Sequence, residues 1–190
     1  MGVDVGIANF AALSTGQLIP ALNIFRKQEA ALVHAQRRLS HIQEFSNKRF
    51  SKNWKKAKTR VQRLHARIAA ARLDFLHKLT YTISKNHAIV CIENLRIMNM
   101  MKSAAGTVEE PGTSVAAKSG LNKSISKHSW GEFFRQLGYK LEWNGGRHVA
   151  VPARNTSRTC PECGCVSPLN RPTQARFCCI ESGYETPTLT

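Results

Sequence analysis

The sequence predicts an α/β protein in which a mixed β-sheet is combined with a long pair of helices. Residues 1–25 contain three short apolar segments separated by Gly- and Ser-containing turns, a pattern typical of strands. Residues 26–85 repeat apolar residues at the spacing of amphipathic helices. Residues 88–94 form a nearly continuous apolar run, as expected of a strand covered on both faces. Because this run follows a helix, we expect it to be central in the sheet, beside the first strand.

The chain is short and strongly basic. Its 190 residues are enough for one domain with a hydrophobic core plus a small module. It has 28 Lys and Arg against 12 Asp and Glu, a net charge of +16, which favours a polyanionic partner, either nucleic acid or an anionic membrane surface. No apolar run approaches ~20 residues and no signal peptide begins at Met1, so we expect a cytoplasmic protein that binds nucleic acid and no membrane.

Most of the positive charge lies in residues 26–85, which hold 16 Lys and Arg against three acids, a net charge of +13. We predict two helices that pack as a hairpin around a loop near residues 45–53, with their apolar stripes facing inward. Outward-facing arginines are then expected to contact nucleic-acid phosphates: Arg60, Arg63, Arg67 and Arg72. The alternative is a charged face that is merely solvated.

Two acidic residues lie in otherwise apolar strand segments. In residues 1–7 the apolar side chains alternate, which places Asp4 on the opposite face between Gly2 and Gly6. A lone carboxylate there is costly to bury unless it is paired or holds a cation, and the alternative is an edge strand with a solvated Asp. Glu93 ends the apolar run of residues 88–94, at the strand end where α/β sheets place their sites.

Residues 99–152 complete the predicted core. Residues 99–127 are rich in Ser, Ala, Gly and Lys and are predicted to form a flexible connector. Ser129 is expected to cap a helix that ends at Gly138. Residues 139–152 are predicted to form a pair of strands, in which residues 149–151 are the buried half.

Five of the six cysteines lie between residues 160 and 179, a pattern that indicates metal binding rather than disulfides in a cytoplasmic protein. Cys160 and Cys163 form a Cys-x2-Cys turn, and Cys179 follows after 15 intervening residues, the spacing of a four-ligand zinc ribbon. The fourth ligand is expected at position 182, where the chain has Ser182. We predict a zinc-ribbon fold with weakly held metal. The alternatives are a substitute ligand, Cys165 or Cys178, and three free thiols without metal.

Five segments in order resemble one known family. They are Gly2-Val3-Asp4-Val5-Gly6, the basic hairpin with Asp74-Phe75-Leu76-His77-Lys78-Leu79, Ile92-Glu93-Asn94-Leu95, Trp130-Gly131-Glu132-Phe133-Phe134-Arg135-Gln136-Leu137 and Thr156-Ser157-Arg158-Thr159-Cys160. Together they resemble the C-terminal half of the TnpB (OrfB) proteins encoded by insertion sequences, relatives of the miniature type V CRISPR effectors. The resemblance covers nearly the whole chain.

The resemblance implies a ribonuclease H-like (RuvC) nuclease core at residues 1–152 and a zinc-ribbon module at residues 153–190. Members of the family are RNA-guided DNA endonucleases, long classed as transposases, so DNA and a guide RNA are the implied partners. Asp4 and Glu93 match the first two acidic ligands of a two-metal site, which holds Mg²⁺ or Mn²⁺ ions ~4 Å apart.

Three departures from the family pattern accompany these matches. No Asp occurs after Asp74, so the third acid and the final helix of the core are missing. The N-terminal half that contacts guide RNA in the family is absent, and Ser182 replaces a zinc ligand. We therefore expect a chain truncated at both ends that is inactive alone. The open alternatives are an active metal-dependent endonuclease, a non-catalytic nucleic-acid-binding remnant and a basic zinc-ribbon protein of transcription or translation.

Overall fold

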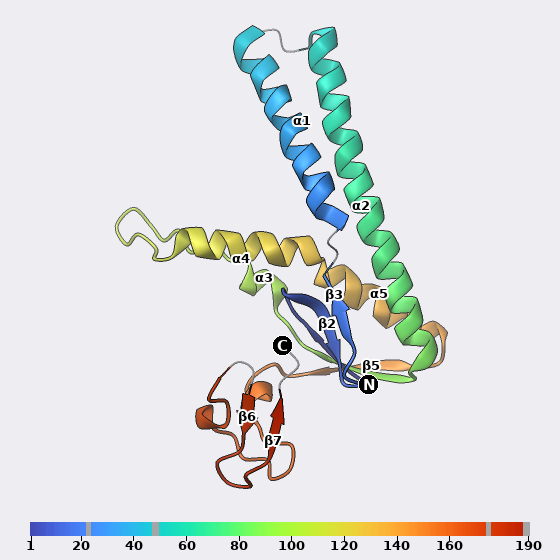
Figure 1. Cartoon of the computed structure of the whole chain (residues 1–190), viewed down its shortest axis with the longest axis vertical. Helices are drawn as coiled ribbons and strands as arrows, with labels where there is room; N and C mark the ends of the chain where they lie inside the picture. Colours follow the sequence, from blue (N-terminus) through green and yellow to red (C-terminus); the bar gives the residue numbers. More distant parts are fainter. Residues whose placement is uncertain (22–23, 47–49, 174–175, 188–190) are drawn as a thin grey trace. The chain divides into compact units, whose positions relative to one another are not determined.

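The computed structural model describes residues 1–21, 24–46, 50–173 and 176–187 and divides the chain into two compact units (Figure 1). The first unit consists of residues 1–21 and 80–190, and the second of residues 22–79. Helix α2 (Lys52–Asn86) begins in the second unit and ends in the first. Among the described residues no helix is long and apolar enough to span a bilayer.

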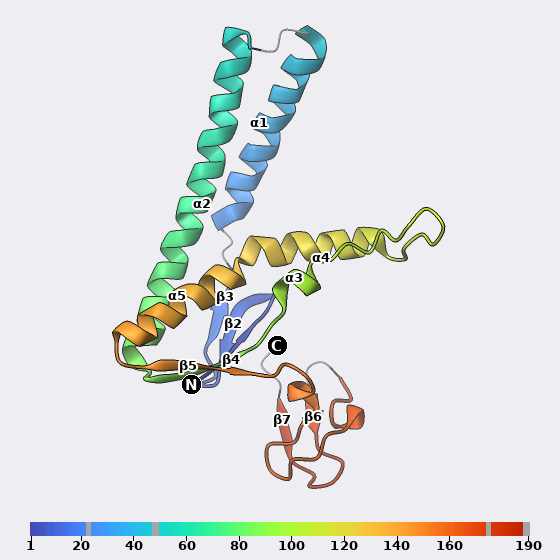
Figure 2. The same ribbon diagram turned by 180° about the vertical axis from the view of Figure 1, so that it is seen from behind.

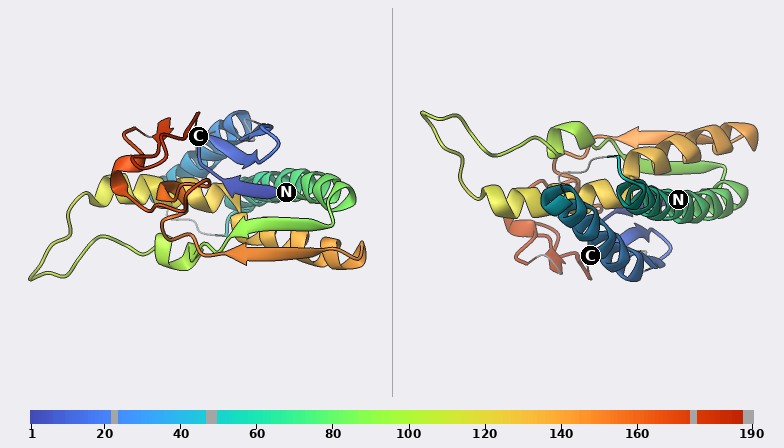
Figure 3. Two further views of the ribbon diagram at one scale, coloured as in Figure 1. Left: turned by 90° about the horizontal axis from the view of Figure 1, so that it is seen from below. Right: turned by 90° about the horizontal axis from the view of Figure 1, so that it is seen from above.

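A five-stranded mixed sheet forms the centre of the first unit. Its strands are β1 (Gly2–Val5), β2 (Asn9–Leu13), β3 (Leu18–Pro20), β4 (Ile89–Glu93) and β5 (Arg147–Val151), in the spatial order β3-β2-β1-β4-β5. Strands β1, β2 and β3 pair antiparallel, whereas β1, β4 and β5 pair parallel and lie side by side in Figure 3. The prediction that the apolar run lies beside the first strand is therefore confirmed.

Helix α5 (Trp130–Trp143) covers one face of this sheet (Figure 2). Its Phe133, Leu137 and Leu141 are fully buried, and the Phe133 ring packs edge-on against Phe10 of β2 with centroids 5.3 Å apart. Val3 of β1 and Ile92 of β4 point into the same core, with 4% and 6% of their surface exposed. Side chains alternate along a strand, so the neighbouring residues of β1 and β4 point to the opposite face.

Several predicted elements between residues 99 and 152 are wrong. The predicted connector contains α3 (Ile97–Met100) and the helix α4 (Val115–His128), because its Ala and Lys residues favour helix and Ile125 is buried. Ser129 makes no side-chain cap, and α5 continues through Gly138 to Trp143.

Only one of the two strands predicted in residues 139–152 is present, since residues 139–143 belong to α5. The predicted buried half of that pair is also wrong in part. Strand β5 lies at the edge of the sheet, and Val149 and Ala150 are exposed. Similarly, the strand region predicted to reach residue 25 ends at Pro20, because proline lacks the N–H that would extend the ladder.

The second unit contains the predicted pair of helices, α1 (Ile24–Ser46) and the first part of α2. The loop predicted between them includes residues 47–49, which lie outside the described residues. Ser51 lies directly before α2, where its hydroxyl accepts a hydrogen bond from the Trp54 N–H at 3.2 Å and caps the first turn.

The cysteine-rich segment folds into two short helical turns, η1 (Thr156–Arg158) and η2 (Pro168–Asn170), and a two-stranded sheet of β6 (Arg176–Cys178) and β7 (Glu185–Pro187). Residues 174–175 and 188–190 of the predicted ribbon module lie outside the described residues. Phe177, Cys160 and Cys179 form its small buried core.

Candidate metal centres

The sheet register brings Asp4 and Glu93 together. Val3 of β1 is paired with Ile92 of β4. The next residue is Asp4 on β1 and Glu93 on β4. Neighbouring strands lie ~4.8 Å apart, and residues that follow a matched pair point to the same face. The two carboxylates therefore lie side by side on the face opposite the core.

Both carboxylates line a cleft of about 410 Å³. Hydroxyl groups of Ser14, Thr156 and Ser157 line the same cleft, together with Arg171. Within the described part of the chain, Asp4 and Glu93 are the only acidic residues that line it. The cleft therefore offers oxygen ligands of the kind that hard divalent cations prefer.

The charges in the cleft act on one another. Partial burial raises the pKa of Asp4, and the nearby Glu93 carboxylate raises it further, while the Arg171 guanidinium opposes both effects. The Thr156 hydroxyl donates a 2.8 Å hydrogen bond to Glu93 Oε1, which fixes the orientation of that carboxylate. A second positive charge beside Asp4 would relieve the repulsion between the two carboxylates, so the cleft is suited to a cation.

Sequence reasoning missed Thr156 and Arg171 as residues of this cleft. Thr156 stands in a hydroxyl-rich turn directly before the first Cys-x2-Cys, a signal that could have been followed. Arg171 lies between the two cysteine pairs, where no sequence pattern singles it out. The late acidic residues do not reach the cleft: Glu185 forms a 2.8 Å ion pair with Arg176, and Glu181 interacts with the Cys165 thiol.

Three of the predicted thiols converge. The sulfur atoms of Cys160, Cys163 and Cys179 all lie within 4.8 Å of one another, so this cluster could hold a metal ion. The sulfurs of Cys163 and Cys179 lie 3.5 Å apart. Cys165 and Cys178 are outside the cluster. The thiol of Cys178 instead hydrogen-bonds to Glu185, an interaction that raises the pKa of Cys178.

Two turns with the same hydrogen-bond pattern build this cluster. In the first, Cys160 N–H donates to the Cys165 carbonyl and Gly164 N–H donates to the Cys160 carbonyl, at 2.8 and 3.0 Å. In the second, Cys179 N–H donates to Tyr184 and Gly183 N–H donates to Cys179, at 2.9 and 3.0 Å. The two glycines have φ values of +72° and +69°, a conformation that favours glycine.

Ser182 occupies in the second turn the position that Cys163 occupies in the first. Its Oγ lies 3.4 Å from the Cys160 sulfur, so its side chain faces the cluster. Hydrogen bonds from the side chain and backbone of Ser182 lower the pKa of Cys179 from 9.0 to about 6. Cys179 is therefore predisposed to be a thiolate at neutral pH, the form that binds metals.

The structure separates the four predicted nucleic-acid arginines. Arg60, Arg63 and Arg67 are exposed on α2 at a spacing that places them on one side of the helix. Arg72 is half-buried, and burial lowers its pKa while the charge of Glu29 on α1 partly compensates. Arg72 is thus engaged within the hairpin.

Comparison with known proteins identifies two regions of the chain. Residues 1–104 match the OrfB_IS605 family model, described as a probable transposase, and residues 130–187 match the model of the Cas12f1-like TNB domain. The "Putative RNA-guided DNA endonuclease InsQ" of Escherichia coli (strain K12) is 48% identical over 97% of this chain. The "Putative RNA-guided DNA endonuclease" of Streptomyces pristinaespiralis is 34% identical over 90% of this chain. The chain spans 44% and 38% of the lengths of these relatives.

Two solved structures share the fold. One, titled a Cas12f1-sgRNA-target DNA complex, matches 98% of this chain and 46% of its own with a TM-score of 0.57 at 17% identity. The other, titled a CRISPR-Cas12f ternary complex, matches 98% and 36% with a TM-score of 0.59 at 18% identity. The sheet with its helices thus has a Cas12f-like fold. Because the OrfB_IS605 model matches more than half of the residues of this chain, the chain belongs to the OrfB_IS605 (TnpB) transposase family.

Proposed function

We propose that this chain carries the metal-dependent nuclease centre of an RNA-guided DNA endonuclease, built on a ribonuclease H-like (RuvC) core. The placement of Asp4 beside Glu93 on the central parallel strands carries this proposal. The sheet order, with an antiparallel β1-β2-β3 meander joined to parallel β4 and β5, supports the RuvC assignment. The names of the relatives support the endonuclease activity. Residues 1–152 are the proposed nuclease core, and residues 153–190 are the proposed zinc-ribbon module.

Asp4 and Glu93 are the proposed ligands of Mg²⁺ or Mn²⁺, which when bound would activate water and stabilise the leaving oxygen of a phosphodiester. Thr156 is suited to hold the Glu93 carboxylate through its 2.8 Å hydrogen bond. Such outer hydrogen bonds keep a ligand in the geometry that the ion requires. Arg171, which lines the cleft, supplies a positive charge that suits the negatively charged substrate.

Cys160, Cys163 and Cys179 are the proposed ligands of a structural Zn²⁺. Sulfurs 2.3 Å from a tetrahedral ion lie ~3.8 Å apart, which is compatible with the spread of the three thiols. Ser182 takes the fourth position as a poor ligand, so the ion is proposed to be held weakly.

DNA and a guide RNA are the proposed partners, as in the solved complex of the Cas12f1 relative with both nucleic acids. The exposed Arg60, Arg63 and Arg67 are suited to contact the phosphate backbone. We propose that this chain by itself has little nuclease activity, because two carboxylates in the cleft provide fewer ligands than a two-metal site uses.

The metal-binding test is direct. Purified protein should bind Mn²⁺, observed by electron paramagnetic resonance, and Asp4→Asn and Glu93→Gln should each abolish binding. Glu132→Gln is the matched control, since this carboxylate pairs with Arg135 outside the cleft. Equal Mn²⁺ binding by all four proteins would contradict the proposed site and favour a non-catalytic nucleic-acid-binding protein.

Cleavage is tested separately, with single-stranded DNA in the presence of Mg²⁺ or Mn²⁺. We expect slow cleavage or none. Robust cleavage that Asp4→Ala abolishes would contradict the proposed low activity while supporting the assigned centre.

A further inference from the structure

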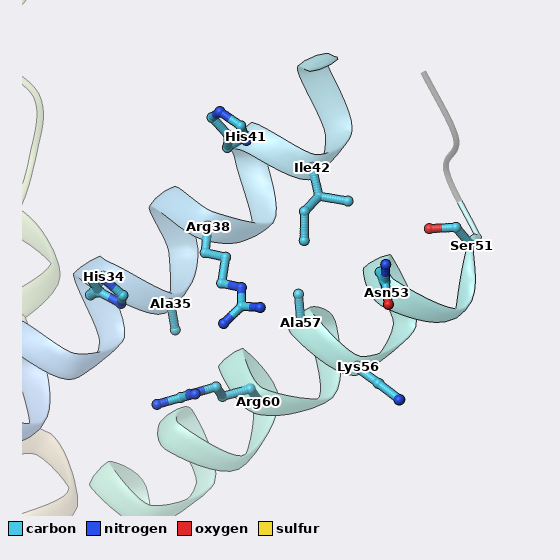
Figure 4. Close-up of a pocket in the computed structure, with 10 residues that line it drawn as sticks. All are labelled: His34, Ala35, Arg38, His41, Ile42, Ser51, Asn53, Lys56, Ala57 and Arg60. Carbon is cyan, nitrogen blue, oxygen red and sulfur yellow. The ribbon is translucent and has the colours of Figure 1, made fainter. Parts of the chain in front are cut away.

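A second cavity, of about 690 Å³, lies in the helical hairpin between α1 and α2 (Figure 4). Arg38 points from α1 into the space between the helices, and Arg60 of α2 lines the same space. Ala35 of α1 and Ala57 of α2 also line it, and their small side chains leave room between the helices. No Asp or Glu is among the described residues that line it.

The described residues of the hairpin do not neutralise the two arginines. Neither guanidinium has a hydrogen bond or ion pair with any residue that the structure describes. Two guanidinium groups facing one cavity repel each other unless an anion lies between them. A phosphate group suits such a pair, because its oxygens accept the paired hydrogen bonds that a guanidinium offers.

An exposed aromatic residue stands at the same end of the hairpin. Phe50 precedes Ser51, which lines the cavity, and 70% of its surface is exposed. Its backbone has a φ of +74°, a costly conformation for a bulky residue and one that often marks a functional site. The Phe50 ring contacts Trp54 with centroids 5.4 Å apart, and the Lys58 ammonium lies 5.0 Å from the centre of the Trp54 ring.

A basic cavity beside an exposed aromatic ring is a combination that binds single-stranded nucleic acid, whose phosphates pair with the cations and whose bases stack on the ring. A duplex keeps its bases stacked internally and has none to offer Phe50. We propose that this end of the hairpin is a binding site for single-stranded nucleic acid, with a backbone phosphate between Arg38 and Arg60 and a base on Phe50. The inference rests on the proposed nucleic-acid binding. It adds that the bound nucleic acid is single-stranded and that it binds at this end of the hairpin.

The test compares two charge-matched double variants of the whole chain. Arg38→Gln with Arg60→Gln alters the cavity, and Arg63→Gln with Arg67→Gln removes the same charge from two positions on α2 that do not line it; all four arginines are exposed. Both lose two charges, so the non-specific salt-dependent part of binding should weaken equally. Fluorescence anisotropy with single-stranded RNA, single-stranded DNA and duplex DNA of one sequence should show the cavity variant about tenfold weaker than the control variant on single strands only.

Phe50→Ala should weaken single-strand binding by about tenfold without changing its salt dependence, because stacking releases no counterions. A preference for RNA or for DNA identifies the source of the strand, and either is consistent with the site. Equal losses in the two double variants, or no effect of Phe50→Ala, would overturn this site while leaving the proposed nucleic-acid binding intact. A wild-type chain that binds none of the probes would refute both.

Discussion

Replacing Ser182 by cysteine should convert a weak zinc site into a tight one. The backbone for a fourth thiolate is already present, because the turn around Ser182 has the same hydrogen bonds and left-handed glycine as the turn around Cys163. The Ser182 Oγ also lies 3.4 Å from the Cys160 sulfur, so a sulfur at this position would face the other three. The substitution therefore needs no rearrangement of the loop.

The size of the effect follows from typical zinc sites. Zinc binding to four-ligand peptides contributes roughly 10–16 kcal/mol, or about 2.5–4 kcal/mol for each ligand. A further thiolate should then tighten zinc binding roughly a hundred- to a thousandfold. With free zinc at about 100 times the dissociation constant, the folded protein should gain about 2.7 kcal/mol over its metal-free form.

Competition with a chromophoric chelator measures the affinity, and thermal unfolding with and without zinc measures the gain in stability. Cys178→Ser is the matched control, because this thiol is outside the cluster and should leave zinc binding unchanged. If Ser182→Cys leaves the affinity as it was, the reasoning about the second turn is wrong. A loss of zinc in Cys165→Ser or Cys178→Ser would instead show that a neighbouring thiol serves as the fourth ligand.

Four other outcomes can be measured. Zinc binding by the wild type should weaken steadily as the pH falls, because protons compete for the thiolates: the lowered pKa of Cys179 keeps that thiolate available to about pH 6, whereas the pKa of Cys163 is raised, so this ligand should be protonated first. In the metal-free protein the Cys179 shift adds stability that is complete above pH 9.0 and is lost as the pH falls to about 6, and a pH titration of unfolding in Cys179→Ser should lack this contribution. Asp4→Asn should stabilise the metal-free protein by at most ~1 kcal/mol, the repulsion of two charges ~5 Å apart in water, in chemical denaturation at neutral pH. The gain should vanish at low pH, where Asp4 is protonated, and a loss of stability at neutral pH would contradict it. Thr156→Val should weaken Mn²⁺ binding roughly tenfold by releasing Glu93, whereas Thr59→Val, on α2, should not. Neutralising Arg63 should lower the salt slope of nucleic-acid binding by about 1, and an unchanged slope would indicate a merely solvated side chain.

Much of the secondary structure could be predicted from local sequence patterns. The alternation around Asp4, the apolar run before Glu93 and the long stripes of the hairpin are each set by neighbouring residues, so the strands β1 to β4 and the helices α1 and α2 were predictable. The cysteine spacing likewise predicted which three thiols would converge, because the Cys-x2-Cys turn at Cys160 and the matching Cys-x2-Ser turn at Cys179 are local structures. The prediction failed at α4, where the Ser and Gly residues indicated a connector, whereas the helix preference of the Ala and Lys residues and the burial of Ile125 together support a helix.

The sequence by itself thus determined the acidic strand positions, the thiols and the basic hairpin. Only the tertiary structure decided how segments far apart in the chain meet. The parallel register of β1 with β4 places Asp4 beside Glu93 rather than one residue away, and that register depends on Val3 and Ile92 sharing one core. Thr156, Arg171 and the Arg38–Arg60 cavity also depend on contacts between distant segments. Periodicity reports which face of an element is buried, whereas the partner that buries it is set by packing across the whole fold.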